Sequence, residues 1–342
     1  MSMSKAISAY NSAGDVDMDR YLEKRTTWRT RMGICLVVLF VLLFIPFVVA
    51  LTVIGPERDS GTAAQYEEQG TESVYDVICE QEAGSIRVPL ETALISMLGS
   101  VMDGDSPGEA LRAMAILLRT QAVYEIEQTG SCLAEGYAGD AELRERWGEQ
   151  YDTYYAIYAD AVKQTCGIIM TVDGKPIETA YHQISAGRTR DPALIGDGHV
   201  YHWKSVDCEQ DLMAQEYRTV VDCPAEKLDA SLKVLTGSTS ITGAQIVIEE
   251  RDETGYVLSL SVNGEGFDAF RIGGEQFRSV FGLPSSYFTM EGTGEGVRFI
   301  CFGSGHGYGL SIYQSCMLAG EGWTCMDILK YFFDEIVFMR IA

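Results

Sequence analysis

One stretch of the chain limits what the rest of it can be. Residues 32–55, MGICLVVLFVLLFIPFVVALTVIG, form a run of 24 residues without a charge, long enough as a helix to cross the core of a bilayer. No amphipathic pattern supports a buried core helix instead. A cleaved signal peptide is the other alternative, but its apolar region usually spans roughly 7–15 residues. We therefore expect a single-pass membrane helix at 32–55.

The residues before this stretch predict its orientation. Six Lys and Arg residues precede it, and Arg29 and Arg31 lie at its edge. Cytoplasmic flanks of membrane helices carry an excess of Lys and Arg. Residues 1–31 are therefore expected to form a cytoplasmic tail, and the chain after residue 55 to lie outside the cell membrane.

The composition of the chain predicts a folded, strongly acidic domain beyond the stretch. Apolar residues make up 46% of the chain and charged residues 22%, as in proteins with a sizeable core. The net charge is −23, and the residues before the stretch carry +2, which leaves −25 on the remainder. Such a surface repels phosphate backbones, so nucleic acid is not expected as a partner.

Helical and strand-like patterns are mixed after residue 85, which predicts an α+β fold. Residues 56–84 are rich in Gly, Glu, Gln, Ser and Thr and are expected to form a linker, with the domain over 85–342. Apolar spacing predicts helices at Val88–Met102, from Ser106 to about Ile126, and at Ala141–Thr165. In the second helix Ser106 is the expected N-cap, with Pro107 at the first position. The tyrosines of the third helix are assigned to core packing rather than to a sugar-binding stripe.

The second half of the domain is expected to contain most of the strands. Asp173-Gly174 lies between two β-rich runs, a strong signal for a hairpin. Further strands and a short helix at GGEQFRSVFG are expected between residues 231 and 300. The last two helices are expected to begin near Ser311 and Thr324.

Eight of the nine cysteines follow the apolar stretch. An even number outside the membrane permits disulfides, and Cys316 with Cys325 is one possible pair, although small buried thiols fit equally well. No CxxC motif or His/Cys cluster has the spacing of a zinc site.

Four blocks of sequence, in order, resemble the SpoIID/LytB family of stage II sporulation D and amidase-enhancer proteins. GHGYGLS at 305–311, followed by MDILKYFF at 326–333, resembles the end of that family. The opening block of the family is resembled by two segments, LETAL and SPGEALRAMAILLRT. Its middle block is resembled by TCGIIMTVDGKPIETAYHQISAGRTR. The block before GHG is resembled by the run from Val257 to Met290. The resemblance covers residues 88–335 and implies a single mixed helix and sheet domain.

The resemblance implies an activity on the cell wall. Sporulation members of the family are lytic transglycosylases that act on peptidoglycan glycan strands stripped of peptides. A carboxylic acid protonates the glycosidic oxygen, and the 6-hydroxyl of the sugar closes onto the anomeric carbon to give a 1,6-anhydro end. One carboxyl group can serve first as acid and then as base.

The position that corresponds to this acid in the family holds a valine. Counting back 18 residues from Arg119, as the family's spacing requires, gives Val101, and Val101 cannot transfer a proton. Asp103 and Asp105 follow in the same loop, and Asp103 is the candidate for a substitute acid. Both are flanked by glycine, whereas an acid needs an apolar setting that raises its pKa.

The resemblance also suggests residues that contact glycan. Arg119 and Lys204 are expected to hold the lactyl carboxylate of muramic acid. Arg119 could instead pair with a carboxylate in the core, and Lys204 could lie on the surface. The expected substrate-binding residues are His182, Ser185, Arg188, Thr189, His202, His306 and Ser311, and the two histidines His182 and His306 could equally hold their glycine-rich turns.

The resemblance does not imply a metal or another cofactor for this chain. Some members bind zinc through the histidine at position 182 and cysteines shortly after it. Arg188 and Leu194 occupy that loop here, so no metal is expected.

Three hypotheses remain open on these grounds. The chain binds glycan strands with weakened or lost catalysis, or it cleaves them with a displaced acid such as Asp103. Alternatively, it is a non-catalytic protein that recruits or stimulates a cell-wall amidase, such as stage II sporulation protein P.

Overall fold

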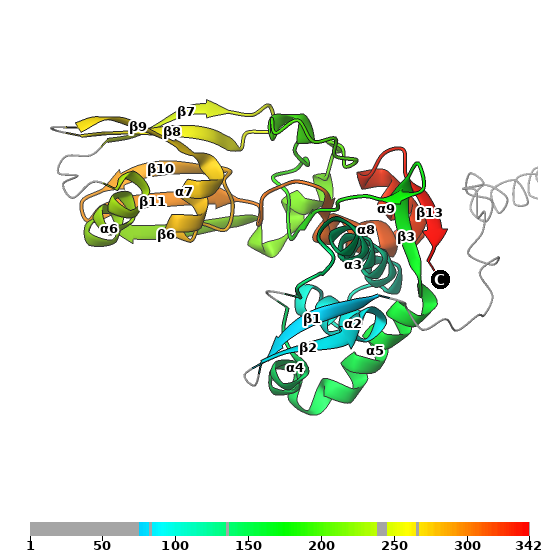
Figure 1. Ribbon diagram of the computed structural model, residues 1–342. Coiled ribbons are helices and arrows are strands. Elements are labelled where there is room, and N and C mark those ends of the chain that lie inside the picture. The colour runs from blue at the N-terminus through cyan, green and yellow to red at the C-terminus, as the bar shows by residue number, and fades with distance from the viewer. Residues whose placement is uncertain (1–74, 82–83, 135–136, 238–244, 265–266, 342) are drawn as a thin grey trace, which may run out of the picture. The chain divides into compact units, whose positions relative to one another are not determined.

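The computed structural model describes residues 75–81, 84–134, 137–237, 245–264 and 267–341 (Figure 1). All of them belong to one compact unit, Thr71–Ala342. The predicted cytoplasmic tail, the predicted membrane helix at 32–55 and most of the predicted linker lie outside the described residues. Within the described part of the chain, no helix is long and apolar enough to cross a membrane.

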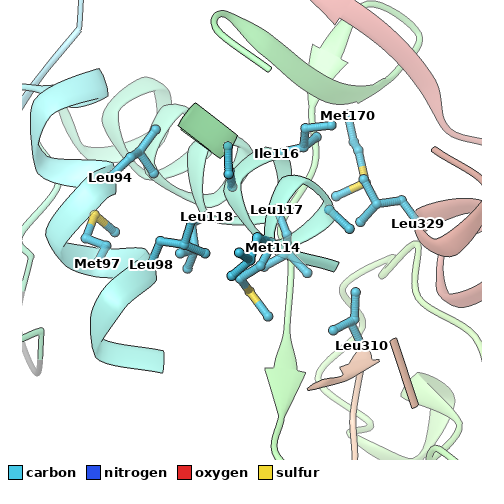
Figure 2. Packing of buried hydrophobic residues seen from close by; sticks show 14 of the residues in the cluster. Leu94, Met97, Leu98, Met114, Ile116, Leu117, Leu118, Met170, Leu310 and Leu329 are labelled. Carbon is cyan, nitrogen blue, oxygen red and sulfur yellow. The ribbon is translucent and has the colours of Figure 1, made fainter. Parts of the chain in front are cut away.

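The fold is built around α3 (Gly108–Thr129), which is buried on nearly all sides. Most of its contacts are with four helices and one strand: α2 (Leu90–Val101), α5 (Tyr151–Gln164), α8 (Ile312–Gly320), α9 (Cys325–Phe332) and β3 (Ile168–Val172). Figure 2 shows side chains of α3 between Leu94 and Leu98 of α2 on one side and Met170 and Leu329 on the other. Each fully buried leucine of this kind contributes about 1.5–3 kcal/mol to folding, which explains why the middle of α3 is largely apolar.

The first turn of α3 differs from the prediction. Pro107 is the N-cap, and Ser106 makes no capping hydrogen bond. Glu109 does not cap its own helix. Its Oε2 accepts a hydrogen bond of 2.7 Å from the backbone N–H of Cys325, in the first turn of α9. The prediction of Ser106 as a cap is therefore wrong, and Glu109 instead ties the start of the domain to its end.

The helix predicted at Ala141–Thr165 is two helices. The chain forms α4 (Asp140–Trp147), a 3-10 turn (Gly148–Gln150) and then α5. Gly148 lies between them at φ +52°, a conformation that interrupts a right-handed helix and suits glycine. Tyr158 of α5 is fully buried, as expected for a core residue, whereas Tyr154 lines a cavity described below.

Three small sheets surround the helices. β1 (Asp76–Gln81) and β2 (Gly84–Pro89) form a hairpin. β3 pairs with β4 (Lys175–Pro176) and with the last strand, β13 (Val337–Arg340). β5 (Tyr181–His182) lies parallel to β12 (Leu310–Ser311). The hairpin between β3 and β4 is confirmed, and both turn residues, Asp173 and Gly174, have positive φ, as a type I′ turn requires.

Because of the hairpin of β1 and β2, the folded domain begins earlier than the predicted residue 85. Residues 76–84 were predicted as linker, but Val77 in β1 is fully buried and packs into the core around α3. The structure therefore corrects the linker prediction over these residues. The residues around β1 are rich in Gly and Glu, and this composition led to the prediction of a linker. The strand that pairs with β1 follows within a few residues.

A second core lies between two antiparallel sheets and two helices. The sheets have the orders β10-β11-β6 and β7-β8-β9. Their strands are β6 (Arg218–Pro224), β7 (Gln245–Arg251), β8 (Val257–Gly264), β9 (Phe267–Gly273), β10 (Phe288–Thr293) and β11 (Gly296–Phe302). The helices are α6 (Ala225–Thr236), absent from the prediction, and α7 (Gly274–Phe281). Phe277 stacks on Phe281 and Phe288 at its centre, and the mixed architecture confirms the α+β fold.

Candidate functional site

A polar cavity opens beside Val101, at the end of α2. Its volume is about 420 Å³. We call it the Val101 cavity. Its walls are the segment from Gly99 to Asp105, Arg146 and Trp147 of α4, Tyr154 of α5, and Gln183 after β5.

Two glycines allow aromatic rings to form the floor of this cavity. A Cβ atom on Gly99 would lie 2.5 Å from the ring of Trp147, and one on Gly104 would lie 2.1 Å from the ring of Tyr154. Trp147 in turn stacks on the buried ring of Tyr158 at 5.3 Å between centroids. The Tyr158 hydroxyl donates to the carbonyl of Met102 at 2.7 Å. The loop after α2 is therefore held against rigid aromatic side chains.

Val101 itself is half-buried and contributes a backbone carbonyl to the cavity. Gln183 Nε2 donates to this carbonyl at 3.3 Å, which ties the middle block of the sequence to the loop after α2. Asp103 and Asp105 line the same cavity, but both side chains are exposed to solvent. The carboxyl groups nearest Val101 thus lack the apolar surroundings that a general acid needs.

Arg119 was a candidate to hold substrate, and its position in the structure rules this out. Its side chain is 0% exposed and forms a two-point ion pair with Glu91, at 2.6 and 2.7 Å. Its remaining donors reach the carbonyls of Ala115, Val162 and Ile168 and the hydroxyl of Thr165. The structure shows the other role expected for Arg119, an ion pair with a carboxylate in the core. No N–H group of its guanidinium is left to bind a ligand.

Lys204 also lies away from the Val101 cavity. Its ammonium is 3.5 Å from the carboxylate of Asp334, and its backbone N–H donates to Phe332. The neighbouring His202 lines a separate cavity of about 380 Å³, together with Tyr124, Lys175, Glu178 and His199. We call this the Glu178 cavity. The structure therefore does not place Lys204 and His202 beside Val101.

His182 and His306 lie together, 6.0 Å apart between ring centroids. His182 is 3% exposed, and its Nδ1–H donates to the carbonyl of Tyr308 at 2.9 Å. Its Nε2 is buried without a hydrogen-bond partner among the described residues. Burial, reinforced by the neighbouring His306, lowers the pKa of His182 to about 3. This ring is neutral at physiological pH and holds the glycine-rich turn, one of the two roles expected for it.

His306 reaches a third cavity. Its Nδ1 accepts a hydrogen bond from the backbone N–H of Tyr308 at 3.1 Å, and burial lowers the pKa of the ring. The cavity, of about 390 Å³, is also lined by Leu117 and Gln121 of α3 and by Thr179, Ala180 and Tyr181. We call it the His306 cavity.

Ser185 and Ser311 are brought together by a residue that the sequence did not single out. Asp211 is fully buried and accepts from the backbone N–H of Ser185 at 2.7 Å and from the hydroxyl of Ser311 at 2.8 and 2.9 Å. Burial raises the pKa of Asp211 to about 6. These two serines therefore bind a carboxylate of the chain itself, and Ser311 also caps α8.

Arg188 and Thr189 are used by the loop that carries them. Arg188 is exposed and pairs with Asp207 at 2.7 Å. Thr189 is buried, and its hydroxyl donates to the carbonyl of Lys204 at 2.9 Å. Neither side chain lines any of the three cavities described above.

Among the described residues, no group of three or more His, Cys, Asp and Glu side chains is placed to hold a metal ion. Cys316 and Cys325 are both free thiols, and burial raises the pKa of each.

The residues that the sequence analysis missed are Trp147, Tyr154, Gln183 and Asp211. Gln183 lies inside the quoted block TAYHQISAG, between His182 and Ser185, which were both named. Trp147 and Tyr154 are seven residues apart, a helical spacing, but the interruption at Gly148 concealed how the two rings meet. Asp211 lies in a 3-10 turn (Glu209–Met213) for which no local pattern indicated burial.

Comparisons with known proteins agree with the resemblance seen in the sequence. A family model described as SpoIID, stage II sporulation protein, matches residues 81–172, the part of the chain that contains most of the Val101 cavity. The chain is 28% identical over 259 residues to stage II sporulation protein D of Bacillus subtilis (strain 168), which covers 72% of this chain and 73% of that protein. It is 25% identical over 261 residues to the protein of the same name from Bacillus amyloliquefaciens, which covers 73% and 74%. The chain is thus similar to the SpoIID family of stage II sporulation proteins.

Proposed function

We propose that this chain is a membrane-anchored protein that remodels peptidoglycan during sporulation by binding peptide-free glycan strands, with lytic transglycosylase activity weak or lost. The Val101 cavity is the proposed binding site. The run of 24 uncharged residues at 32–55 is the proposed anchor.

The observation that carries this proposal is a cavity with intact walls and no enclosed acid. Trp147 and Tyr154 offer aromatic faces of the kind that pack against sugar rings, and Gln183 and Arg146 offer polar groups that fix orientation. Val101 stands where the family resemblance places the acid. Protonation of a glycosidic oxygen needs a carboxyl held in an apolar setting, and Asp103 and Asp105 are exposed.

Two other functions are tied to particular observations. Because Asp103 and Asp105 line the Val101 cavity, movement of the loop would bring one of them to the glycosidic oxygen, and the chain would then be an active transglycosylase. A role as an amidase-recruiting protein rests on the amidase-enhancer branch of the family, and stage II sporulation protein P is the proposed partner.

Digestion of amidase-treated, peptide-free glycan strands tests the proposal. The full chain in detergent micelles, its Val101→Glu variant and a blank without protein are compared by mass spectrometry for 1,6-anhydro ends. A co-sedimentation assay with the same strands measures binding. We expect the unaltered chain to bind and to form little product, and the Val101→Glu variant to form more, since general acid catalysis typically contributes roughly 10²–10⁴-fold.

The remaining outcomes separate the alternatives. Abundant anhydro ends from the unaltered chain, lost in Asp103→Asn or Asp105→Asn, would establish a displaced acid and reject the proposal. Binding without product from either protein, with stimulation of an amidase added to the assay, would favour the recruiting role. Absence of binding would reject a glycan function altogether.

A further inference from the structure

One extended segment of the chain, Lys175–Gln183, contributes to all three cavities. Residues 175–178 line the Glu178 cavity, residues 179–181 the His306 cavity, and Gln183 the Val101 cavity. The segment begins in β4 and ends just after β5, with no helical residue between them. At about 3.3 Å per residue an extended segment of this length spans roughly 26 Å.

One face of α3 runs beside this segment. Leu117 and Gln121 line the His306 cavity, and Tyr124 and Gln128 line the Glu178 cavity. These four positions are spaced by four, three and four residues, so they lie on one side of the helix. Gln121 Oε1 accepts from the backbone N–H of Thr179 at 2.7 Å, which fixes the segment against the helix.

The His306 cavity is connected to the Val101 cavity by a short run of contacts. The hydroxyls of Tyr181 and Tyr137 lie 3.4 Å apart. The next residue, Ala138, donates its backbone N–H to the hydroxyl of Ser100 at 2.8 Å. Tyr181 lines the first of these cavities and Ser100 the second, so Tyr137 and Ala138 bridge residues of the two linings.

We propose that the three cavities are successive subsites for a single extended glycan strand, with the Glu178 cavity as the subsite farthest from Val101. This inference rests on the proposed function. It adds that recognition depends on the length of the strand, because a fragment that occupies only the Val101 cavity leaves the contacts along α3 unused.

The Glu178 cavity has the chemistry of a sugar subsite. Its volume of about 380 Å³ is within the range of small-molecule sites. The Glu178 carboxylate lies 3.3 Å from His199 Nε2, and its remaining lone pairs suit hydroxyl and acetamido N–H groups. Among the described residues Lys175 has no ion-pair partner, so its ammonium is available to the lactyl carboxylate of a muramic acid unit.

Binding of glycan fragments of increasing length tests the inference. The full chain in detergent micelles is titrated by calorimetry with a peptide-free disaccharide and with successively longer peptide-free fragments. We expect the affinity of the unaltered chain to rise with length until the three cavities are filled. Lys175→Ala and His199→Ala should weaken binding of the longest fragment about tenfold and leave that of the shortest nearly unchanged.

Lys227→Ala is the matched control, since Lys227 is an exposed lysine of α6 outside the cavities, and it should bind as the unaltered chain does. Thermal melting of each variant verifies that it is folded. Affinity that does not depend on length, or distal variants that bind long fragments normally, would overturn the inference and leave the proposed function intact. If fragments of every length fail to bind, the proposed function is overturned as well.

Discussion

The Arg119 guanidinium is fully enclosed, and its charge is balanced by one carboxylate, that of Glu91. We expect Glu91→Gln to lower the free energy of unfolding by about 3–5 kcal/mol, because it leaves a buried cation without its counter-charge. Thermal unfolding followed by circular dichroism measures the loss. Asp222→Asn, which removes one partner of the exposed ion pair with Arg298, serves as the control and should leave the melting temperature nearly unchanged. Equal effects of the two substitutions would contradict a special role of the buried pair.

The buried imidazole of His182 makes stability depend on pH. Its pKa in the folded chain, about 3, is below the ordinary value of 6.5, so the unfolded chain takes up the proton first. The stability that the neutral ring confers is complete above pH 6.5 and is lost as the pH falls toward 3. We expect His182→Asn, whose amide can still donate to the Tyr308 carbonyl, to flatten the pH dependence of the melting temperature over this window. An unchanged profile would show that His182 does not dominate it.

Asp211 acts in the opposite direction within the same window. Its pKa of about 6 in the folded chain is above the ordinary value of 3.8, so the folded chain takes up the proton first. The stabilisation by this carboxyl is present below pH 4 and is lost as the pH rises through 6. We expect Asp211→Asn to make the loss of stability on acidification steeper than in the unaltered chain, as measured by melting temperatures between pH 4 and 7. A shallower loss would contradict this assignment.

Single residues differ in how far their roles could be predicted from sequence. The spacing around Arg119 drew attention to Val101, and the structure places Val101 at a cavity. The role of Arg119 depended on whether a carboxylate lay within reach of it. Because Glu91 is distant in sequence, this ion pair could not be predicted. Asp211 carries no local signal, because its burial results from contacts with Ser185 and Ser311, which come from two other parts of the chain.

At the scale of elements, the short parallel pair β5 and β12 requires glycine at position 309. Gly309 has φ +71°, and a Cβ atom there would lie 2.0 Å from the carbonyl oxygen of Ala180. Gly237, at the end of α6, has a similar φ of +66° but open space around it. We expect Gly237→Ala to cost about 1–2 kcal/mol for the left-handed conformation alone. Gly309→Ala should cost about 1–3 kcal/mol more because the backbones must also separate.

Thermal unfolding of the two alanine variants measures this difference. Because both substitutions impose the same conformational strain, the difference between them reports only the close approach of the strands. Equal losses in the two variants would show that β5 and β12 can move apart without cost.

Elements with a strong local signal were predicted correctly, and those set by a single residue or by tertiary contacts were not. The turn at Asp173-Gly174 and the start of α9 near Thr324 were predicted from adjacent residues, and in the structure Thr324 and Asp327 form a capping box there. The split between α4 and α5 depends on Gly148 alone, within a run that is otherwise helical. The strand β1 lies in a polar segment and is stabilised by the burial of Val77 against α2 and α3.

The whole molecule carries a net charge of −23, and muramic acid units of a peptide-free strand are also anionic. We expect the association rate with such strands to increase when NaCl is raised from low to physiological concentration, because the Debye length shortens to about 8 Å and the repulsion is screened. Surface plasmon resonance with immobilised strands measures the rate. A decrease with salt would show that local cations such as Lys175 and Arg146 dominate the encounter.

The assembly of two cores could be anticipated only as a mixed fold. Strand order depends on partners far apart in sequence: β13 at the end of the chain pairs with β3, and β6 pairs with β11. Periodicity identifies a strand but not its neighbour. The grouping of cavities along Lys175–Gln183 likewise appears only when α3 and that segment are placed together.

The arrangement around α3 affects how such a chain folds as it is synthesised. This buried helix is made early, but α8 and α9, which cover part of it, are made much later, and the Glu109 contact that fixes α9 cannot form before then. A growing chain therefore exposes apolar side chains of α3 until α8 and α9 have been made. Contacts between such distant parts give a high contact order and slow folding. Loss of the last few dozen residues would accordingly leave an aggregation-prone chain rather than a smaller folded domain.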